Sequence, residues 1–260
     1  MDFRTVLANL LRKVVAVGRR LLYGEGGVFL SPSYGAINEA RLDHLASLRL
    51  DLSRKSVLEV GAGIGLLTRF FEDRDCKVLS TDGNPENIRV MQRKYPRRRI
   101  EYLDLDRASD LSRLGQFDIV FCYGTLYHLS KPEEALRALS DICRGMILLE
   151  TQVSPGRYSD LLLVHEPAGR AQAVSGVGCR PTRLWVMETL RKYYGHAYIT
   201  RTQPLHPEFP LEWDILPIRP AYRAVFVGSK HRLRSLDLLE EIPEHQQRVS
   251  AKVHYSERKI

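Results

Sequence analysis

The chain has 260 residues, 44% of them hydrophobic, and its formal net charge is +8. These values predict one α/β domain with additions, large enough to bury a full core. The sequence holds neither a run of about 18 apolar residues nor a secretory leader pattern, so we expect a cytoplasmic chain without a transmembrane segment. The four cysteines form no Cys-x-x-Cys pair, which argues against a disulfide framework and a zinc site, and we expect no metal.

Residues 1–52 are expected to form an N-terminal helical cap. Over residues 2–22, apolar side chains recur at steps of three and four and the opposite face is basic, which predicts an amphipathic helix. Such a helix can pack on the domain, on a second copy of the chain in a homodimer, or on a membrane surface. A second helix is expected from about Glu39 to Leu48.

A glycine-rich loop follows the first predicted strand. The apolar run from Val57 to Val60 is typical of a buried parallel strand, and glycines stand at positions 61, 63 and 65. A strand that turns through glycines into a helix brings backbone N–H groups close to a ligand. The dinucleotide fingerprint would place its third glycine at position 66, which is leucine, so the spacing argues against NAD.

Acidic residues follow the next two predicted strands. The strand over residues 77–82 ends in Asp82, which lies 21 residues after Gly61. An acid at this place in a doubly wound sheet can accept hydrogen bonds from both ribose hydroxyls, or it can cap the helix that begins near Asn84. The third strand begins at Arg99 and is followed by Asp104 and Asp106.

The fourth and fifth strands lead into polar residues at the same sheet edge. Residues 117–122 form an apolar strand that runs into the sequence Tyr-Gly-Thr-Leu-Tyr-His over residues 123–128. Residues 145–152 form the fifth strand, with Glu150 and Gln152 at its carboxyl end. Because ligands bind outside the carboxyl ends of the strands in open α/β sheets, we expect these side chains around one crevice.

The second half of the chain carries two additions. Residues 153–181 are too long for an ordinary connection, and we expect them to form an insert that contacts the substrate. A helix from Arg183 to Tyr194 and a sixth strand over residues 197–201 come next. A proline-rich lid over residues 203–220 then precedes a seventh strand over residues 222–228. Residues 231–260 are expected to form a charged tail.

Two motifs resemble those of the class I S-adenosylmethionine (SAM)-dependent methyltransferases. One is the spacing Glu59-x-Gly61-x-Gly63-x-Gly65, and the other is the strand from Phe117 that ends in Leu-Tyr-His-Leu before a proline-led acidic helix. The resemblance is specific over residues 55–152. It implies a SAM-binding domain over residues 53–230 with a seven-stranded, mostly parallel, doubly wound sheet whose seventh strand is antiparallel. It also implies SAM as the cofactor and S-adenosylhomocysteine as the product.

The resemblance also implies which residues hold the cofactor. Asp104 would accept from the adenine amino group and the Leu105 N–H would meet the ring, with Asp106 as the reserve. Tyr34 and Arg41 would face the methionine carboxylate or the acceptor, or else belong to a surface turn and a helix salt bridge. The full set expected at the cofactor is Tyr34, Glu59, Gly61, Ala62, Gly63, Gly65, Asp82, Gly83, Asp104, Leu105, Tyr123 and Gly124.

Methyl transfer from a sulfonium needs a nucleophile held in line, about 3 Å away, more than it needs a strong base. An oxygen or nitrogen acceptor still loses a proton, and the candidate bases are His128, Glu150, His165 and His206. His128 can also be structural, and Glu150 can also pair with an arginine. The residues expected to contact the acceptor are Tyr127, Gln152, Tyr158, Arg180, Trp185 and Trp213.

Three functions remain open at this point. We expect a methyltransferase that modifies an oxygen, or a nitrogen, of a small-molecule or glycan-type acceptor, because the additions surround the crevice and form no separate binding module. The Gly-x-Leu-Tyr-His phrase is also similar to that of enzymes that carboxymethylate the wobble uridine of tRNA from a carboxylated SAM. Those enzymes use a basic residue for the extra carboxylate, and the sequence identifies none. The basic block from Arg89 to Arg99 permits RNA but is also typical of a solvated face. The third function is a catalytically idle SAM-binding partner subunit.

Overall fold

The computed structural model describes residues 27–107, 111–166, 173–213 and 222–249. The predicted N-terminal amphipathic helix, with the homodimer that it would form, lies outside these residues. So do the second part of the predicted lid and the last residues of the predicted tail. Among the described residues, no helix is both long and apolar enough to cross a membrane.

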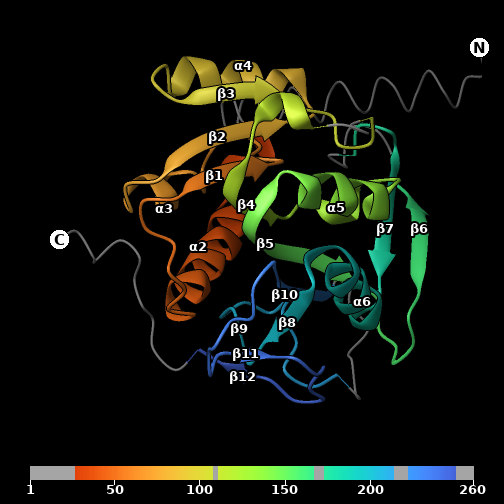
Figure 1. Ribbon diagram of the computed structural model, residues 1–260. Coiled ribbons are helices and arrows are strands. Elements are labelled where there is room, and N and C mark those ends of the chain that lie inside the picture. The colour runs from red at the N-terminus through yellow and green to blue at the C-terminus, as the bar shows by residue number, and fades with distance from the viewer. Residues whose placement is uncertain (1–26, 108–110, 167–172, 214–221, 250–260) are drawn as a thin grey trace, which may run out of the picture.

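A mixed sheet of eight strands forms the centre of the molecule (Figure 1). The strand order is β11-β8-β10-β5-β4-β1-β2-β3, and β10 runs antiparallel to both of its neighbours. The predicted doubly wound fold is therefore confirmed, with β8 and β10 as the sixth and seventh strands and β11 as an added edge strand. The strands are β1 (Ser56–Val60), β2 (Lys77–Asp82), β3 (Arg99–Tyr102), β4 (Phe117–Tyr123), β5 (Cys143–Val153), β8 (His196–Thr200), β10 (Tyr222–Ser229) and β11 (Leu238–Leu239).

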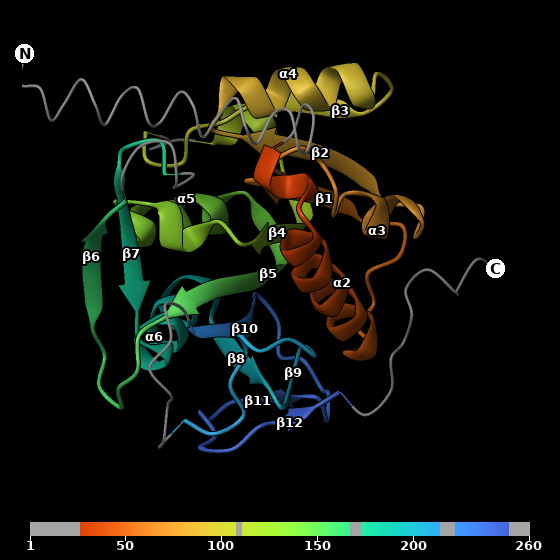
Figure 2. The same ribbon diagram turned by 180° about the vertical axis from the view of Figure 1, so that it is seen from behind.

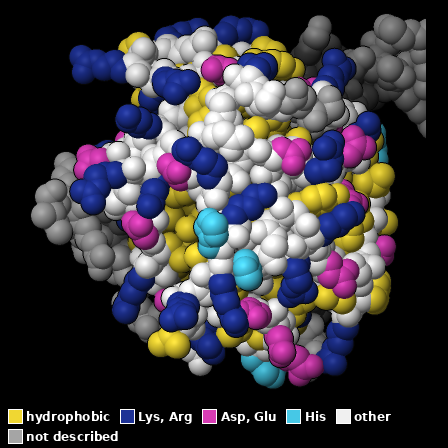
Figure 3. All heavy atoms as spheres, in the orientation of Figure 1, with side chains coloured by type: hydrophobic (Ala, Val, Ile, Leu, Met, Phe, Trp, Pro, Cys, Tyr) yellow, Lys and Arg dark blue, Asp and Glu magenta, His cyan; other side chains and the backbone are white. Residues whose placement is uncertain are grey.

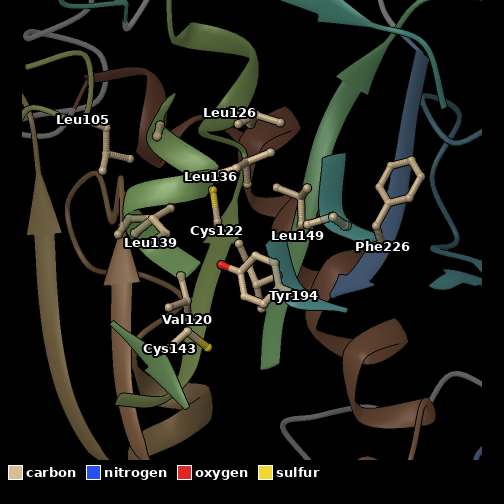
Figure 4. Packing of buried hydrophobic residues seen from close by; sticks show 14 of the residues in the cluster. Leu105, Val120, Cys122, Leu126, Leu136, Leu139, Cys143, Leu149, Tyr194 and Phe226 are labelled. Atoms are coloured by element: carbon tan, nitrogen blue, oxygen red, sulfur yellow. The ribbon is translucent and has the colours of Figure 1, made fainter. Parts of the chain in front are cut away.

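Two hydrophobic clusters cover the two faces of the sheet because neighbouring side chains of a strand point to opposite faces. In β4, Val120 and Cys122 join the cluster under α5 and α6, which Figure 4 shows, whereas Ile119 and Phe121 join the cluster under α2 and α3. Helix α4 packs along β2 and β3. The helices are α2 (Pro32–Ser47), α3 (Arg69–Glu72), α4 (Pro85–Lys94), α5 (Pro132–Asp141) and α6 (Arg183–Tyr194). Three 3-10 turns accompany them: η1 (Gly27–Leu30), η2 (Ser112–Leu114) and η3 (Leu126–His128).

The second predicted helix begins earlier than expected. Helix α2 starts at Pro32 because the side chain of Ser31 caps it by accepting from the Tyr34 N–H, and proline is well suited to the first helical turn. The longer helix brings Tyr34 and Arg41 onto one element beside the sheet.

The insert after β5 is a hairpin outside the main sheet. Strands β6 (Leu161–His165) and β7 (Val177–Pro181) pair antiparallel with each other, and both views show them beyond the end of α5 (Figures 1 and 2). Residue Cys179 on β7 is buried, and its Sγ lies 3.3 Å from the Leu126 carbonyl oxygen. The hairpin is therefore packed against the loop that follows β4.

The C-terminal segment folds back as far as residue 249, where a charged tail was expected. Strand β11 extends the sheet beside β8, and β12 (Gln247–Arg248) pairs in parallel with β9 (Thr202–Gln203). The side chain of Gln246 is buried and accepts from both Gln203 and Trp213. A buried amide with satisfied hydrogen bonds holds this segment against the domain.

Candidate functional site

The glycine-rich loop after β1 adopts a backbone that favours glycine. Gly61, Gly63 and Gly65 have φ values of 64°, 59° and 76°. A Cβ atom on Gly61 would fall 2.1 Å from Oγ1 of Thr125, and one on Gly63 would fall 2.5 Å from the ring of Phe29. The loop therefore needs glycine both for its conformation and for its close contacts with Thr125, just after β4, and with η1.

Asp82 ties the end of β2 to this loop. Its carboxylate accepts from the N–H of Gly63 at 2.7 Å and from the N–H of Asn84 at 2.8 Å. Nδ2 of Asn87 donates to the same carboxylate at 3.0 Å. Burial raises the pKa of Asp82, and these donors oppose that rise. The cap of α4 is Asn84, so Asp82 is not the helix cap that was the alternative interpretation.

Two hollows meet at Gly61, which lines both. The first lies over the ends of β2, β3 and β4 and encloses about 530 Å³ of empty space, mouth included. The second lies between α2 and the ends of β1 and β4. Among the residues expected at the cofactor, the first hollow is lined by Gly61, Asp82, Gly83, Asp104, Leu105 and Gly124. The second is lined by Tyr34, Glu59, Gly61, Ala62 and Tyr123. Gly63 and Gly65 shape the loop without lining either hollow.

The second hollow is lined by two residues whose buried polar atoms have no hydrogen-bond partner among the described residues. Oε2 of Glu59 accepts from Thr68 at 2.6 Å and from Ser80 at 2.7 Å. The other oxygen, Oε1, is buried and has no hydrogen-bond partner in the described part of the chain, and the same holds for the Tyr123 hydroxyl. Burial raises the pKa of Glu59 to about 7. Because buried polar atoms are nearly always hydrogen-bonded, this hollow fits a ligand that carries donor groups, such as an ammonium.

A buried ion-pair network lies beside Gly124. Glu150 is fully buried, and its carboxylate contacts Nη2 of Arg41 at 2.6 Å and Nη1 of Arg223 at 3.0 Å. Burial acts to raise the pKa of Glu150, but the two guanidiniums outweigh it and hold that pKa below its ordinary value. With both oxygens paired and no exposed surface, Glu150 is not placed to act as a general base. The arginine pairing that was the alternative is what the structure contains.

The same network gathers residues from four elements. Nη2 of Arg223 donates to the Tyr127 hydroxyl at 3.1 Å, and its Nε contacts Glu208 at 2.5 Å. A Cβ on Gly124 would lie 3.1 Å from Nη2 of Arg41, so this guanidinium borders the turn that was expected at the sulfonium. Burial raises the pKa of Tyr34 to about 12, and the charge of Arg41 opposes the rise.

His206 lies at the edge of this network. Burial lowers its pKa, and Arg223 and Arg41 act in the same direction. Its Nδ1 accepts from the N–H of Glu208 at 3.3 Å, so the neutral ring carries its proton on Nε2. An Nε2–H nitrogen donates a hydrogen bond and cannot take a proton, which weakens the interpretation of His206 as a base.

His128 lines the first hollow and is held by the insert. Its Nδ1 lies 2.6 Å from Oε2 of Glu166, whose other oxygen is 3.1 Å from Nη2 of Arg180. The side chains of His128 and Glu166 are 14% and 8% exposed, so this contact is shielded from solvent. Arg180 therefore acts here as a partner of Glu166, although it was expected at the acceptor.

The predicted base His165 and several residues predicted to contact the acceptor lie apart from both hollows. His165 and Tyr158 are exposed, and Trp185 packs on the core under α6. Trp213 is buried away from the crevice, where its Nε1 donates to Gln246 and its ring lies under the guanidinium of Arg183. Their residue types suit ligand contact, but β6, α6 and the segment before residue 214 carry them elsewhere.

Sequence reasoning missed Arg223, Glu166 and Glu208. Arg223 stands next to the start of a strand that is otherwise apolar, and because β10 is antiparallel, that start lies at the ligand edge, opposite Gln152. This placement was the available signal. Glu166 and Glu208 lie in the insert and the lid, where no periodic pattern predicts a neighbour. Among the described residues, no group of three His, Cys, Asp or Glu side chains is arranged to hold a metal.

Comparison with known proteins matches the centre of the chain to a methyltransferase domain family, over residues 58–145. A ubiquinone biosynthesis O-methyltransferase of Xanthomonas oryzae pv. oryzae is 32% identical over 127 residues, which are 45% of this chain and 50% of that protein. A tRNA U34 carboxymethyltransferase of Pseudomonas savastanoi pv. phaseolicola is 33% identical over 123 residues, covering 45% of this chain and 39% of that protein. The matches thus span half or less of these relatives' length.

Solved structures share the fold. The N-terminal domain of EvdMO1, crystallised in the presence of SAH and D-fucose, superposes with a TM-score of 0.56 at 20% identity, covering 74% of this chain and 82% of that one. The magnesium protoporphyrin IX methyltransferase of Synechocystis PCC 6803, with bound SAM, gives a TM-score of 0.53 at 15% identity, covering 89% and 98%. At this level of identity the likeness establishes the fold.

Proposed function

We propose that this chain, which belongs by its central domain to the class I SAM-dependent methyltransferases, binds SAM across the ends of β1 to β4 and methylates a small-molecule or glycan-type acceptor on oxygen. One observation carries the proposal. Two hollows meet at Gly61, one bordered by the carboxylates of Asp82 and Asp104 and the other containing the unpartnered oxygen of Glu59.

The two hollows suit different halves of SAM: the first suits the adenosine, and the second suits the methionine. In the first, Asp82 would accept from the ribose hydroxyls and Asp104 from the adenine amino group, with the Leu105 N–H toward the ring. In the second, Oε1 of Glu59 would accept from the methionine ammonium, and burial would strengthen that contact. Gly61 and Gly124 border the junction, where the absence of side chains leaves room for the sulfonium.

The chain's own part in the chemistry is to align the acceptor and remove its proton. The bound cofactor supplies a methyl group that is already activated. Of the four predicted bases, His128 is the one that lines the cofactor hollow. Its imidazole would take the proton of an acceptor hydroxyl as the acceptor oxygen attacks. Tyr127 and Arg223 would hold the acceptor on the other side of Gly124.

Two structural features support a compact acceptor, and the named relatives support a hydroxyl as its reacting group. The insert and the Pro-rich segment are packed beside the crevice, and the described residues contain no separate binding domain. Basic side chains on the face in Figure 3 are interspersed with acidic ones, as in an ordinary solvated surface. Relatives named as O-methyltransferases agree with oxygen as the accepting atom.

Titration calorimetry with S-adenosylhomocysteine tests the cofactor assignment. We expect binding to the intact chain and at least a tenfold loss in Gly63→Arg, whose side chain would meet Phe29. Undiminished binding by Gly63→Arg would contradict the assignment. A screen of hydroxylated acceptors with isotopically labelled SAM then tests catalysis. Cofactor binding without transfer to any acceptor would favour the idle partner subunit.

A second candidate is carboxymethyl transfer to RNA, and the arginine pair beside Gly124 favours it. Arg41 and Arg223 place two buried cations at the methyl side of the crevice, where a carboxylated donor would carry its extra carboxylate. The likeness to the tRNA U34 carboxymethyltransferase points the same way. Tighter binding of carboxylated SAM than of SAM, abolished in Arg223→Gln, would support this candidate. Co-purified RNA whose binding weakens steeply with salt would identify the acceptor class.

A further inference from the structure

A short contact between the insert and η3, in the loop that follows β4, joins two titratable side chains. Nδ1 of His128 lies 2.6 Å from Oε2 of Glu166, across 38 positions of the chain. Glu166 sits just after β6, and its backbone N–H donates to the Gly176 carbonyl at 3.0 Å, which closes the hairpin there. The hairpin therefore fixes the backbone that carries the carboxylate.

Arg180 locks the second oxygen of Glu166. Its Nη2 lies 3.1 Å from Oε1 of Glu166, while its Nη1 donates to the carbonyl oxygens of Tyr127 and Cys179. A Cβ on Gly178 would lie 2.5 Å from the carbonyl oxygen of Tyr127 and 2.8 Å from the carboxyl carbon of Glu166. Only glycine at this position therefore lets β7 lie so close to η3 and to Glu166. Both oxygens of the carboxylate are thus assigned, one to the imidazole and one to the guanidinium.

This arrangement determines where the imidazole proton resides. An ionised carboxylate only accepts hydrogen bonds, so the nitrogen that faces it must carry a proton. His128 is therefore in the Nδ1–H tautomer whenever it is neutral, and Nε2 is the nitrogen that gains or loses a proton. Nε2 has no protein partner in the described ranges, and the ring lines the first hollow together with Asp82.

We propose that Glu166 is a positioning residue that holds His128 in the Nδ1–H tautomer and so presents Nε2 to the first hollow as an acceptor for a ligand hydroxyl. The inference rests on the proposed function and assigns the insert a part in it. The hydroxyl belongs either to the cofactor ribose or to the methyl acceptor. In the second case the O–H proton passes to Nε2 while the acceptor oxygen forms its bond to the methyl carbon and the carbon–sulfur bond breaks. The positive charge then moves from the sulfonium to the imidazolium, which Glu166 stabilises.

One residue of the insert lines the same hollow directly. Val174 is among its lining residues, and a Cβ on Gly83 would lie 3.0 Å from the Val174 side chain. The insert thus borders the hollow directly through Val174 and indirectly through Glu166, which contacts the lining residue His128. This placement explains why a long connection follows β5 at the ligand edge.

The variant Glu166→Gln tests the proposal because an amide has a single acceptor oxygen. Arg180 only donates, so it holds that oxygen, and the amide NH2 group then faces His128. Nδ1 must accept from this NH2, which moves the proton to Nε2 and reverses the tautomer. Glu133→Gln is the matched control, because Glu133 also pairs with a cation, Lys192, but lies on α5 outside both hollows.

The first measurement needs no cofactor. Long-range 1H–15N NMR of the full chain, with the His128 signals assigned by His128→Asn, should show Nδ1–H in the wild type and in Glu133→Gln, and Nε2–H in Glu166→Gln. An Nε2–H tautomer in the wild type would overturn the proposal even if Glu166→Gln failed to fold. An unchanged tautomer in a folded Glu166→Gln would overturn it equally.

The second measurement separates the two sources of the hydroxyl. If Nε2 serves the ribose, Glu166→Gln should weaken binding of S-adenosylhomocysteine at least tenfold. If it serves the acceptor, that affinity should persist while kcat falls at least tenfold and its dependence on pH changes. The other charged groups near His128 remain in every variant: three line the first hollow and one contacts Glu166, namely Asp82, Asp104, Asp106 and Arg180. A changed pH profile therefore reports on Glu166. Unchanged affinity, kcat and pH profile would overturn the proposal. A wild type that does not bind S-adenosylhomocysteine would instead refute the proposed function and leave the NMR result standing.

Discussion

Arg223 and Glu150 stand 73 positions apart in the chain, yet Nη1 of Arg223 lies 3.0 Å from Oε1 of Glu150 in the buried centre of the site. Arg41 approaches the other oxygen from α2. Because charges in such a place are costly without partners, the network ties α2, β5 and β10 together beside Gly124.

Removing one arginine from this network should lower the free energy of unfolding substantially. In Arg223→Met, Glu150 stays buried with one guanidinium instead of two, and we expect the free energy of unfolding to fall by about 3–5 kcal/mol. Urea denaturation followed by circular dichroism measures it. Arg232→Gln is the control, because it removes an exposed ion pair with Glu240 and should cost about 0.5 kcal/mol or less. Similar losses in the two variants would contradict a stabilising role for the buried network.

Glu59 should make stability depend on pH in an unusual direction. Its pKa is raised from 4.5 to about 7 in the folded chain, so ionising it costs more there than in the unfolded chain. The stability that protonated Glu59 contributes is present below about pH 4.5 and is lost as the pH rises to about 7. Relative to wild type, Glu59→Gln should therefore gain up to about 3 kcal/mol between pH 4.5 and pH 8. A difference between the two chains that stays constant with pH would show that Glu59 ionises normally.

Cofactor binding should release a proton from the same residue. Near pH 6.5 Glu59 is largely protonated, and the methionine ammonium beside Oε1 would favour its ionised form. Calorimetry of S-adenosylhomocysteine binding in buffers of different ionisation enthalpy should show a fraction of a proton released by the wild type. Glu59→Gln should release less. Equal release by both chains would place the ammonium elsewhere.

Gly61 should tolerate no side chain. Gly61→Ala adds a Cβ that would overlap Oγ1 of Thr125 at 2.1 Å and keeps a φ of 64° that alanine disfavours. We expect at least a tenfold loss of S-adenosylhomocysteine affinity in calorimetry. Gly115→Ala is the control: no atom lies within 4 Å of the added Cβ, but φ is 84° and ψ is −159°, a conformation nearly exclusive to glycine, so it should cost about 1–3 kcal/mol of stability. Cofactor affinity should remain intact in that control.

Replacing His128 in η3 and replacing His165 on β6 should have different effects on methyl transfer. His165 is exposed on β6 and lines neither hollow, so His165→Gln should leave kcat/KM within about twofold of wild type. His128→Gln should lower kcat by about a hundredfold or more if the imidazole is the general base. Steady-state kinetics with labelled SAM measure both effects. Comparable rates for wild type and His128→Gln would remove His128 from the chemistry.

Local patterns in the sequence were sufficient for the sheet and for one side of the site. The apolar runs, the glycine spacing and the acids after the second and third strands each lie within a short stretch. Parallel strands bring such stretches to one edge in a known order, so the sequence alone predicts that Asp82, Asp104 and Gly124 lie around one crevice, and all three line the first hollow. The start of α2 was missed because Ser31 and Pro32 are capping signals in a stretch that has little helical periodicity.

Only the tertiary structure decided which charged side chains surround Gly124 and His128. Glu150 was a possible base until the fold enclosed it between Arg41 and Arg223, whose elements no local pattern pairs. Glu166 contacts His128 because the hairpin of β6 and β7, which no local pattern predicts, packs against η3. The sequence determined the elements and the edge where they meet, since these depend on short-range periodicity. The charge partners depend on contacts between distant segments, and packing alone brings those segments together.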